Sequence, residues 1–184
     1  MNEYRNVMLI SPNDIKNMGD INSNVDEEII GASIRAVQNV YLTDVLGVDL
    51  VQKLQYLTYN QIKGLEDNLE DTYNSHYKAL LSDYISQVMG YKVASELCLR
   101  TALKIRNAGI IQTNDNNISN VSLKDVKYLT DIYETYYNSA LNRMMDFINE
   151  NKSLFPEVKC KGMNNKYGNI GLWLGQGGEK WKRN

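Results

Sequence analysis

Several residue types that mark common classes of protein are scarce in this chain of 184 residues. It has two prolines, two cysteines and one histidine. Cys98 and Cys160 have neither the number nor the spacing of a disulfide framework or a zinc site, so we expect both thiols to be reduced and structural. The sequence therefore predicts no metal site and no bound cofactor.

Long apolar runs are missing as well. The longest stretch without a charge, residues 167–178, has twelve residues, five of which are glycine. A membrane-spanning helix needs roughly 18 apolar residues. The first residues include an acid and only a short apolar run, unlike a secretory signal peptide. We therefore expect no contact with a membrane and a protein that stays in the cytoplasm where it is made.

Motifs that carry catalysis are equally scarce. The single histidine, His76, has no Ser or Cys nucleophile in a recognisable motif to pair with it, so we expect a surface or capping role. Residues 175–180 match neither the GxxxxGK[ST] nor the GxGxxG spacing of phosphate-binding loops. The acidic patch of residues 66–71 and the Asn-rich residues 114–117 lack the pattern of a calcium loop. The sequence predicts no catalytic residue, and hence no enzyme.

The charge of the chain is close to balanced but unevenly distributed. It has 20 basic and 22 acidic residues, a net charge of −2, which does not favour general nucleic-acid binding. Residues 152–184 carry six Lys and one Arg against two Glu, a net charge of +5, which leaves residues 1–151 at −7. The chain thus has an acidic body and a basic tail.

Apolar residues recur at helical spacing along most of the body, and no stretch alternates convincingly with the period of a strand. Ser11 and Pro12 are typical of a helix start, and Ser122 with Asp125 resembles a capping box. The pattern predicts helices over residues 12–18, 26–47, 49–64, 75–105 and 122–151, with a loop at 107–120. We therefore expect an all-α fold, a bundle of four to five helices in which residues 75–105 form the central, most buried helix.

The last part of the chain changes character, and we divide the sequence into a helical domain, 1–151, and an extended, Gly-rich, basic C-terminal arm, 152–184. Such a composition cannot bury enough surface to fold alone, yet it holds both tryptophans. We expect its large apolar side chains to bind a partner, or alternatively to pack back on the chain's own bundle. These residues are Ile170, Leu172, Trp173, Leu174 and Trp181.

Thirteen tyrosines are a high count for this length. Several of them, including Tyr84, Tyr91 and Tyr133, fall beside apolar residues on the predicted helices. Packing in the core is one interpretation. The other is assembly, because tyrosine is enriched where subunits meet.

Two stretches of the body carry a resemblance to a known family. Residues 9–16, 24–35 and 41–47 (LISPNDIK, NVDEEIIGASIR and YLTDVLG) resemble the N-terminal half of small α-helical head-tail connector proteins of crAss-like tailed phages that infect Bacteroidales. Residues 105–110 (IRNAGI), an Asn/Ser loop and residues 121–129 (VSLKDVKYL) are similar to the family's helix, loop, helix junction. The resemblance covers most of residues 8–150 and leaves out the segment from Lys166 onward.

The resemblance implies a structural virion protein without catalytic residues, located at the portal vertex of the virion after assembly in the host cytoplasm. Copies of the chain would form a ring, expected to be a dodecamer, that joins the portal protein to the neighbouring tail or ring proteins. DNA would pass through the channel beside the acidic body without specific binding. The alternative is a helical binding module that captures a host or phage partner in a groove beside the long helix.

Overall fold

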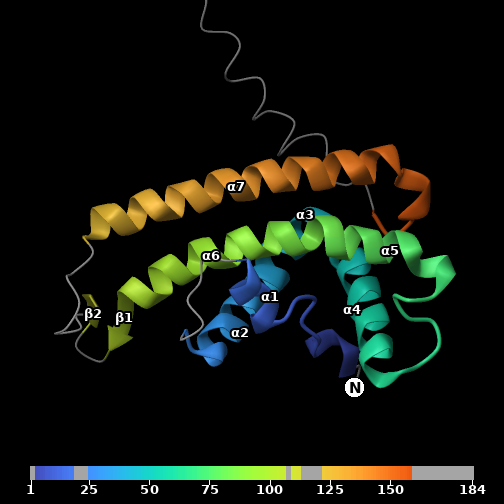
Figure 1. The fold of residues 1–184 in the computed structure, drawn as a ribbon, viewed down its shortest axis with the longest axis horizontal. Helices are drawn as coiled ribbons and strands as arrows, with labels where there is room; N and C mark the ends of the chain where they lie inside the picture. The colour runs from blue at the N-terminus through green and yellow to red at the C-terminus, as the bar shows by residue number, and fades with distance from the viewer. Residues whose placement is uncertain (1–2, 19–24, 107–108, 113–121, 159–184) are drawn as a thin grey trace, which may run out of the picture.

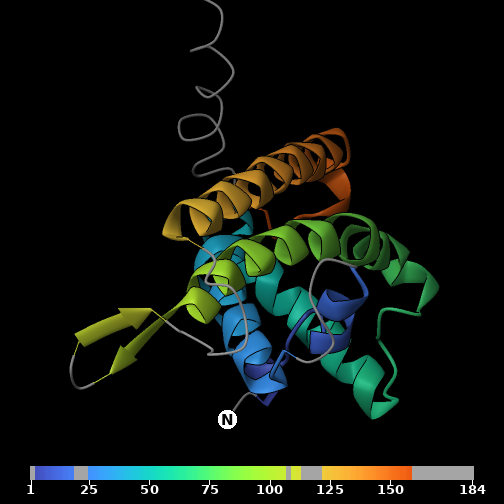
Figure 2. The same cartoon turned by 60° about the vertical axis from the view of Figure 1, so that its left-hand side comes forward.

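The structure is a computed structural model that describes residues 3–18, 25–106, 109–112 and 122–158. Its helices form three layers, seen in Figures 1 and 2. A long central helix separates α7 on one side from a group of shorter helices on the other. The α-helices are α1 (Pro12–Asn17), α2 (Glu27–Ala36), α3 (Thr43–Leu46), α4 (Val48–Lys63), α5 (Ser75–Ala79), α6 (Ser86–Ala102) and α7 (Leu123–Glu150). The all-α bundle expected from the sequence is confirmed.

Short helices of other types complete the body. Two are π-helical, η2 (Val37–Leu42) and η4 (Leu80–Ile85), and three are 3-10 turns, η1 (Glu3–Asn6), η3 (Thr72–Asn74) and η5 (Lys152–Leu154). Such π-helical turns are rare and recur at functional sites. No helix of the described part of the chain is long and apolar enough to cross a membrane.

The predicted helix starts are confirmed. Asp14 N donates to Ser11 Oγ over 3.2 Å, and Ser11 N donates to the Asp14 carboxylate over 2.7 Å, which makes a full capping box ahead of Pro12. Ser122 and Asp125 make the same reciprocal pair at the start of α7. Each pair satisfies backbone N–H groups that the first helical turn leaves without partners.

Two glycines end helices where the sequence predicted. Gly47 follows α3 with φ 82°, and Gly64 follows α4 with φ 64° in the left-handed region. A side chain at either position would be strained, because L residues rarely adopt such backbone angles. Gly64 therefore fixes the direction in which the chain leaves α4.

The central helix is built from α5, η4 and α6, which follow one another without a break from Ser75 to Ala102. Its predicted end at residue 105 is wrong, because residues 103–106 form strand β1 (Leu103–Arg106). This strand pairs antiparallel with β2 (Gly109–Gln112), within the stretch predicted as a loop. The alternation in Leu-Lys-Ile-Arg is only four residues long, too short to be distinguished from the helical pattern that precedes it.

The core lies between the central helix and the layer of α1 to α4. Its fully buried members include Ile30, Ile34, Leu50, Leu54, Leu57, Leu80, Ile85, Met89 and Met144. Two buried amides, unexpected from the sequence, hold the N-terminal segment against this core. Gln38 accepts from Leu9 N and donates to the Val7 carbonyl, while Gln55 donates to the carbonyls of Arg5 and Val7. The central helix is the most buried one, as predicted.

The helical body extends past the expected boundary at Asn151. Phe155 is 1% exposed and its ring lies within 6 Å of the rings of His76, Tyr77 and Phe147. The Tyr77 hydroxyl donates to the Glu157 carboxylate over 2.8 Å. Residues 152–158 thus belong to the body, because one large apolar side chain after α7 fills a gap between the helices. The rest of the predicted arm lies outside the described residues.

Candidate partner-binding surfaces

The five residues predicted to bind a partner, Ile170, Leu172, Trp173, Leu174 and Trp181, lie outside the described residues. The structure does not test this prediction. It does place three other features where a partner could bind: one projecting end of the molecule, an acidic loop at the opposite end, and a groove beside the central helix.

The projecting end consists of residues 98–106 and 109–112, which end α6 and form both strands, and residues 123–132, which begin α7. Figure 1 shows α6 and α7 running side by side in opposite directions and extending together past the other helices. None of the first ten residues of α7 is buried, and Tyr133 is the first buried one. Among the side chains that the structure describes at this end, the exposed large apolar ones are Leu99, Leu123, Tyr128 and Leu129, of which Tyr128 is 69% exposed. Exposed apolar groups gathered in this way are typical of interaction sites.

A buried charge cluster marks the point where the projecting end meets the core. Lys92 on α6 is buried and pairs with Glu134 on α7 over 2.5 Å, and Ser95 donates to the same carboxylate over 2.6 Å. The ammonium of Lys92 also lies 4.3 Å from the ring centre of Tyr41 and 5.2 Å from that of Tyr137. These contacts satisfy a charge that would otherwise be costly to bury, and they fix α7 against α6 and η2.

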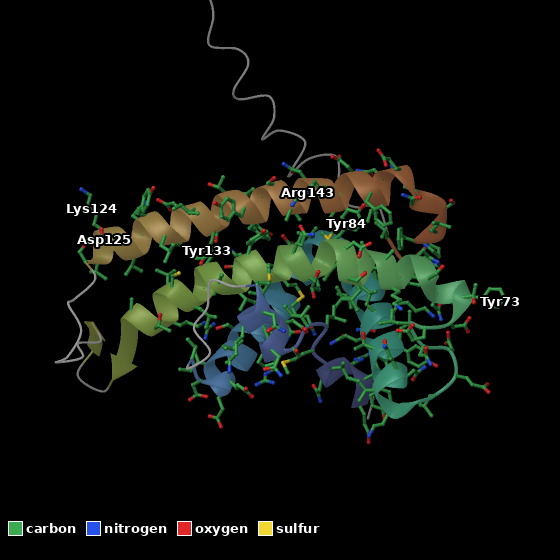
Figure 3. All side chains as sticks on the ribbon, in the orientation of Figure 1. Tyr73, Tyr84, Lys124, Asp125, Tyr133 and Arg143 are labelled. Carbon is green, nitrogen blue, oxygen red and sulfur yellow. The ribbon has the colours of Figure 1, made fainter. Side chains whose placement is uncertain are left out.

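The acidic loop, residues 64–73, lies at the other end of the molecule's longest axis. Figure 3 shows Tyr73 at this end and Lys124 with Asp125 at the projecting end. Two buried asparagines hold the loop in one shape: Asn60 donates to the Asp67 carbonyl over 2.9 Å, and Asn74 donates to the Asn68 carbonyl over 3.0 Å. Because the backbone is fixed in this way, the loop loses little conformational entropy when a partner binds its outer side chains.

Apolar side chains are exposed at the acidic loop too. Tyr73 is 88% exposed and Leu65 nearly half exposed, and Ile62 in the last turn of α4 is 68% exposed. They lie among four acids, Glu66, Asp67, Glu70 and Asp71. The acidic patch seen in the sequence is therefore interspersed with apolar groups, a combination that suits a protein partner better than a metal ion. Within the described residues, no three His, Cys, Asp or Glu side chains are grouped to hold a metal ion.

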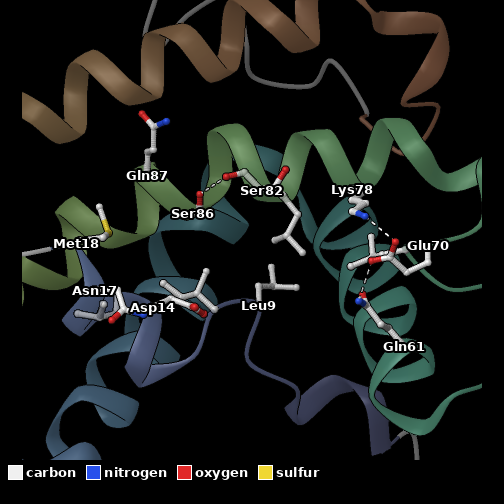
Figure 4. Close-up of a pocket in the computed structure, with 14 residues that line it drawn as sticks. Leu9, Asp14, Asn17, Met18, Gln61, Glu70, Lys78, Ser82, Ser86 and Gln87 are labelled. Carbon is white, nitrogen blue, oxygen red and sulfur yellow. Dashed lines mark hydrogen bonds and ion pairs between the residues drawn. The ribbon is translucent and has the colours of Figure 1, made fainter.

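The groove has a volume of about 510 Å³ and lies between α1, the acidic loop and the central helix. Figure 4 shows Leu9, Asp14 and Met18 on one side and Ser82, Ser86 and Gln87 on the other. Lys78 closes one end through an ion pair with Glu70 over 2.6 Å. The volume of the groove is in the range of ordinary ligand pockets. The π-helical segment η4 contributes Leu81 and Ser82 to the wall of the groove.

His76 packs against the end of the body. Its ring lies 4.1 Å from that of Tyr77 and 5.5 Å from that of Phe155. Burial lowers the pKa of His76, and the positive charge of Lys53 acts in the same direction. The position is half-buried rather than at the surface, because Phe155 covers the ring. Burial likewise raises the pKa of the free Cys98 thiol, which disfavours the reactive thiolate.

Comparison with known proteins assigns the chain to a family whose function is unknown. The model of a family of unknown function, DUF6712, matches residues 42–168, and the chain belongs to this family. The match spans α3 to α7 and so includes both the projecting end and the acidic loop. No curated protein and no solved structure matches the chain.

Proposed function

We propose that this protein is a structural virion component, a head-to-tail connector whose copies form a ring that joins the portal to the tail around the DNA channel. The observation that carries the proposal is the projecting end. Helix α7 has 28 residues, and none of its first ten is buried. Leu123, Tyr128 and Leu129 in this part of the helix are exposed. A helix segment this poorly covered favours a partner that buries its apolar groups.

Three further features support a role in assembly rather than catalysis. The sequence resemblance to connector proteins spans most of residues 8–150, which is the same region that forms the helical body. The two ends of the body expose different side chains. A heterologous ring contact requires this, because it joins two different surfaces of neighbouring copies. The basic residues beyond Val158 give the chain a segment that can bind an acidic or apolar surface of the portal or of a neighbouring tail protein.

The test is co-expression of the chain with the portal protein of the same genome, followed by electron microscopy. We expect rings stacked coaxially on portals. A truncation after Val158 keeps the whole described body and should abolish joining to the portal, since it removes the arm with Trp173 and Trp181. The absence of rings with the full chain, on an intact portal, would overturn the proposal.

A second candidate function is a helical binding module that captures a host or phage partner, and the groove beside the central helix favours it. Substituting Leu81→Arg places a charged side chain at the groove wall. If rings on portals form normally with this variant, the groove has no part in assembly. If the variant fails to form rings while its helical content and thermal midpoint stay unchanged, the groove becomes the leading site.

A further inference from the structure

We infer that the distal arm, residues 159–184, binds the acidic loop of its own copy in the free chain and is displaced from it when the portal binds the arm. The distal arm lies outside the described residues, so the inference uses its sequence and the described body to which it is attached. Displacement by the portal rests on the proposed function, whereas the contact itself is a property of one isolated chain.

The described body ends beside the acidic loop. Val158 is partly buried against the core, and its backbone N–H donates to the Phe155 carbonyl over 3.1 Å. One residue earlier, the Glu157 carboxylate accepts from the Tyr77 hydroxyl over 2.8 Å. Tyr77 follows Tyr73, the last residue of the acidic loop, by about one helical turn. Figure 1 shows the end of α7 at the same end of the molecule as α5. The distal arm is therefore attached close to the loop.

This attachment favours the loop of the same copy over that of a neighbour. Ile170, the first of the five arm residues predicted to bind a partner, is twelve residues beyond Val158. A chain of twelve residues spans up to about 40 Å when extended, which is ample for a surface beside its starting point. A segment tethered at short range meets its binding surface at an effective concentration on the order of 1 mM. The arm of a second copy has to compete with that concentration.

The charges of the two segments are complementary. The distal arm holds six basic residues and one acid, a net charge of +5, whereas the acidic loop holds four acids and no base. Residues 63–78, which add the two flanking lysines, still have a net charge of −2. Of the four acids only Glu70 has an ion pair within the described part of the chain. The loop therefore has unpaired carboxylates to offer to the basic arm.

Apolar side chains are exposed among these carboxylates, and they suit the two tryptophans of the distal arm. Tyr73 is 88% exposed and Ile62, just before the loop, is 68% exposed. Contact with Trp173 and Trp181 would remove apolar surface of both segments from water. Opposite charges set the orientation of such a contact, and the apolar groups add affinity. In the free chain the contact keeps the tryptophans covered until the portal takes their place.

The experiment uses the tryptophans as probes, because the chain has two and both lie in the distal arm. It is acrylamide quenching of tryptophan fluorescence in the full chain, at protein concentrations from about 1 to 100 µM. The test variant carries Glu66→Lys and Asp71→Asn in the acidic loop. The matched control carries Glu28→Lys and Asp26→Asn at the start of α2.

The two variants make the same chemical changes at two places. In each, an exposed Glu becomes Lys, and an Asp that accepts from the backbone N–H two residues further on becomes Asn. Asn caps a helix start about as well as Asp, so each capping hydrogen bond is kept. An unchanged thermal midpoint confirms that each variant is folded.

We expect the wild type and the control to have the same quenching constant at every protein concentration, and the test variant a constant at least about twofold higher. Tyr73→Ser should raise the constant as well, because it removes an apolar contact. Added salt should raise the constant of the wild type, since it screens the charges. The test variant should also form rings at an about twofold lower portal concentration, because its arm is already free.

A wild-type quenching constant equal to that of a synthetic peptide of residues 159–184 would overturn the inference, as would a test variant that matches the wild type. A constant that falls as the protein concentration rises would overturn it too, because a neighbouring copy would then hold the arm. Failure of the proposed function differs from these outcomes. Shielded tryptophans in a chain that never forms rings on portals would keep the contact and remove the connector role. Rings on portals without shielding in the free chain would keep the connector role and remove the contact.

Discussion

The two ends of α7 differ in what surrounds them. The stretch from Tyr133 to Ile148 packs on the core, and Phe155 beyond it closes the body. None of the first ten residues of the same helix is buried, and they expose large apolar groups. The C-terminal part of this helix therefore contributes to the stability of the fold, and its N-terminal part presents the exposed surface at which we propose that a partner binds.

The largest effect expected from this difference is at the end of the body. Truncation after Asn151 removes Phe155 and Glu157, and should lower the free energy of unfolding by about 3–5 kcal/mol, the usual cost of losing a buried phenylalanine. Truncation after Val158 should leave it unchanged. Urea unfolding followed by circular dichroism measures both. Equal stability of the two truncations would show that residues 152–158 are not part of the body.

A matched pair of leucines on α7 tests the comparison within one helix. Leu141 is 4% exposed and Leu129 is 43% exposed. Leu141→Ala should cost about 2–5 kcal/mol, because it leaves a cavity in the core. Leu129→Ala should change stability by less than about 0.5 kcal/mol. If both substitutions cost the same in chemical denaturation, the projecting end is packed as tightly as the core and the comparison fails.

The charge cluster at the boundary should have an intermediate effect. Glu134→Ala leaves the buried Lys92 ammonium without its carboxylate, and we expect a loss of about 1–3 kcal/mol, reduced from the cost for a fully buried pair because Glu134 is partly exposed. Replacing both residues, Lys92→Met with Glu134→Leu, should recover most of the loss. A double variant less stable than Glu134→Ala would contradict this account of the pair.

The smallest effect concerns pH. Burial lowers the pKa of His76 in the folded state, so the unfolded chain takes up a proton first as the pH falls. His76 therefore contributes stability that is present above about pH 6.5, the ordinary histidine pKa, and lost as the pH falls through the lowered value. His76→Gln should reduce the dependence of the thermal midpoint on pH between about 5 and 7. An unchanged pH profile would show that the ring is not sufficiently buried in solution.

Much of the fold could be predicted from the sequence because its signals are local. Ser11, Gly64 and Ser122 each act through their own backbone or side chain within one turn, so the helix ends near them were predicted correctly. The strands of residues 103–112 could not be distinguished from a continued helix, because their pairing depends on contacts between two short segments.

The surfaces were harder to predict than the helices. Hydropathy assigns Gln38, Asn60 and Lys92 to the surface, yet all three are buried. Burial is tolerated because each side chain has a hydrogen-bond or ion-pair partner on a distant element or on the loop that follows. The converse holds for Leu123 and Leu129, which have the helical spacing of core residues and are exposed. Periodicity shows that a face is apolar but not which element covers it.

Amide hydrogen exchange of the free chain and of the chain assembled with the portal compares the two parts of α7 directly. In the free chain we expect the amides of residues 126–132 to exchange at least about 100-fold faster than those of residues 140–148. On assembly they should slow markedly, while residues 140–148 stay unchanged. Equal protection of both parts in the free chain, with no change on assembly, would contradict the claim that the projecting end is where this protein meets its partners.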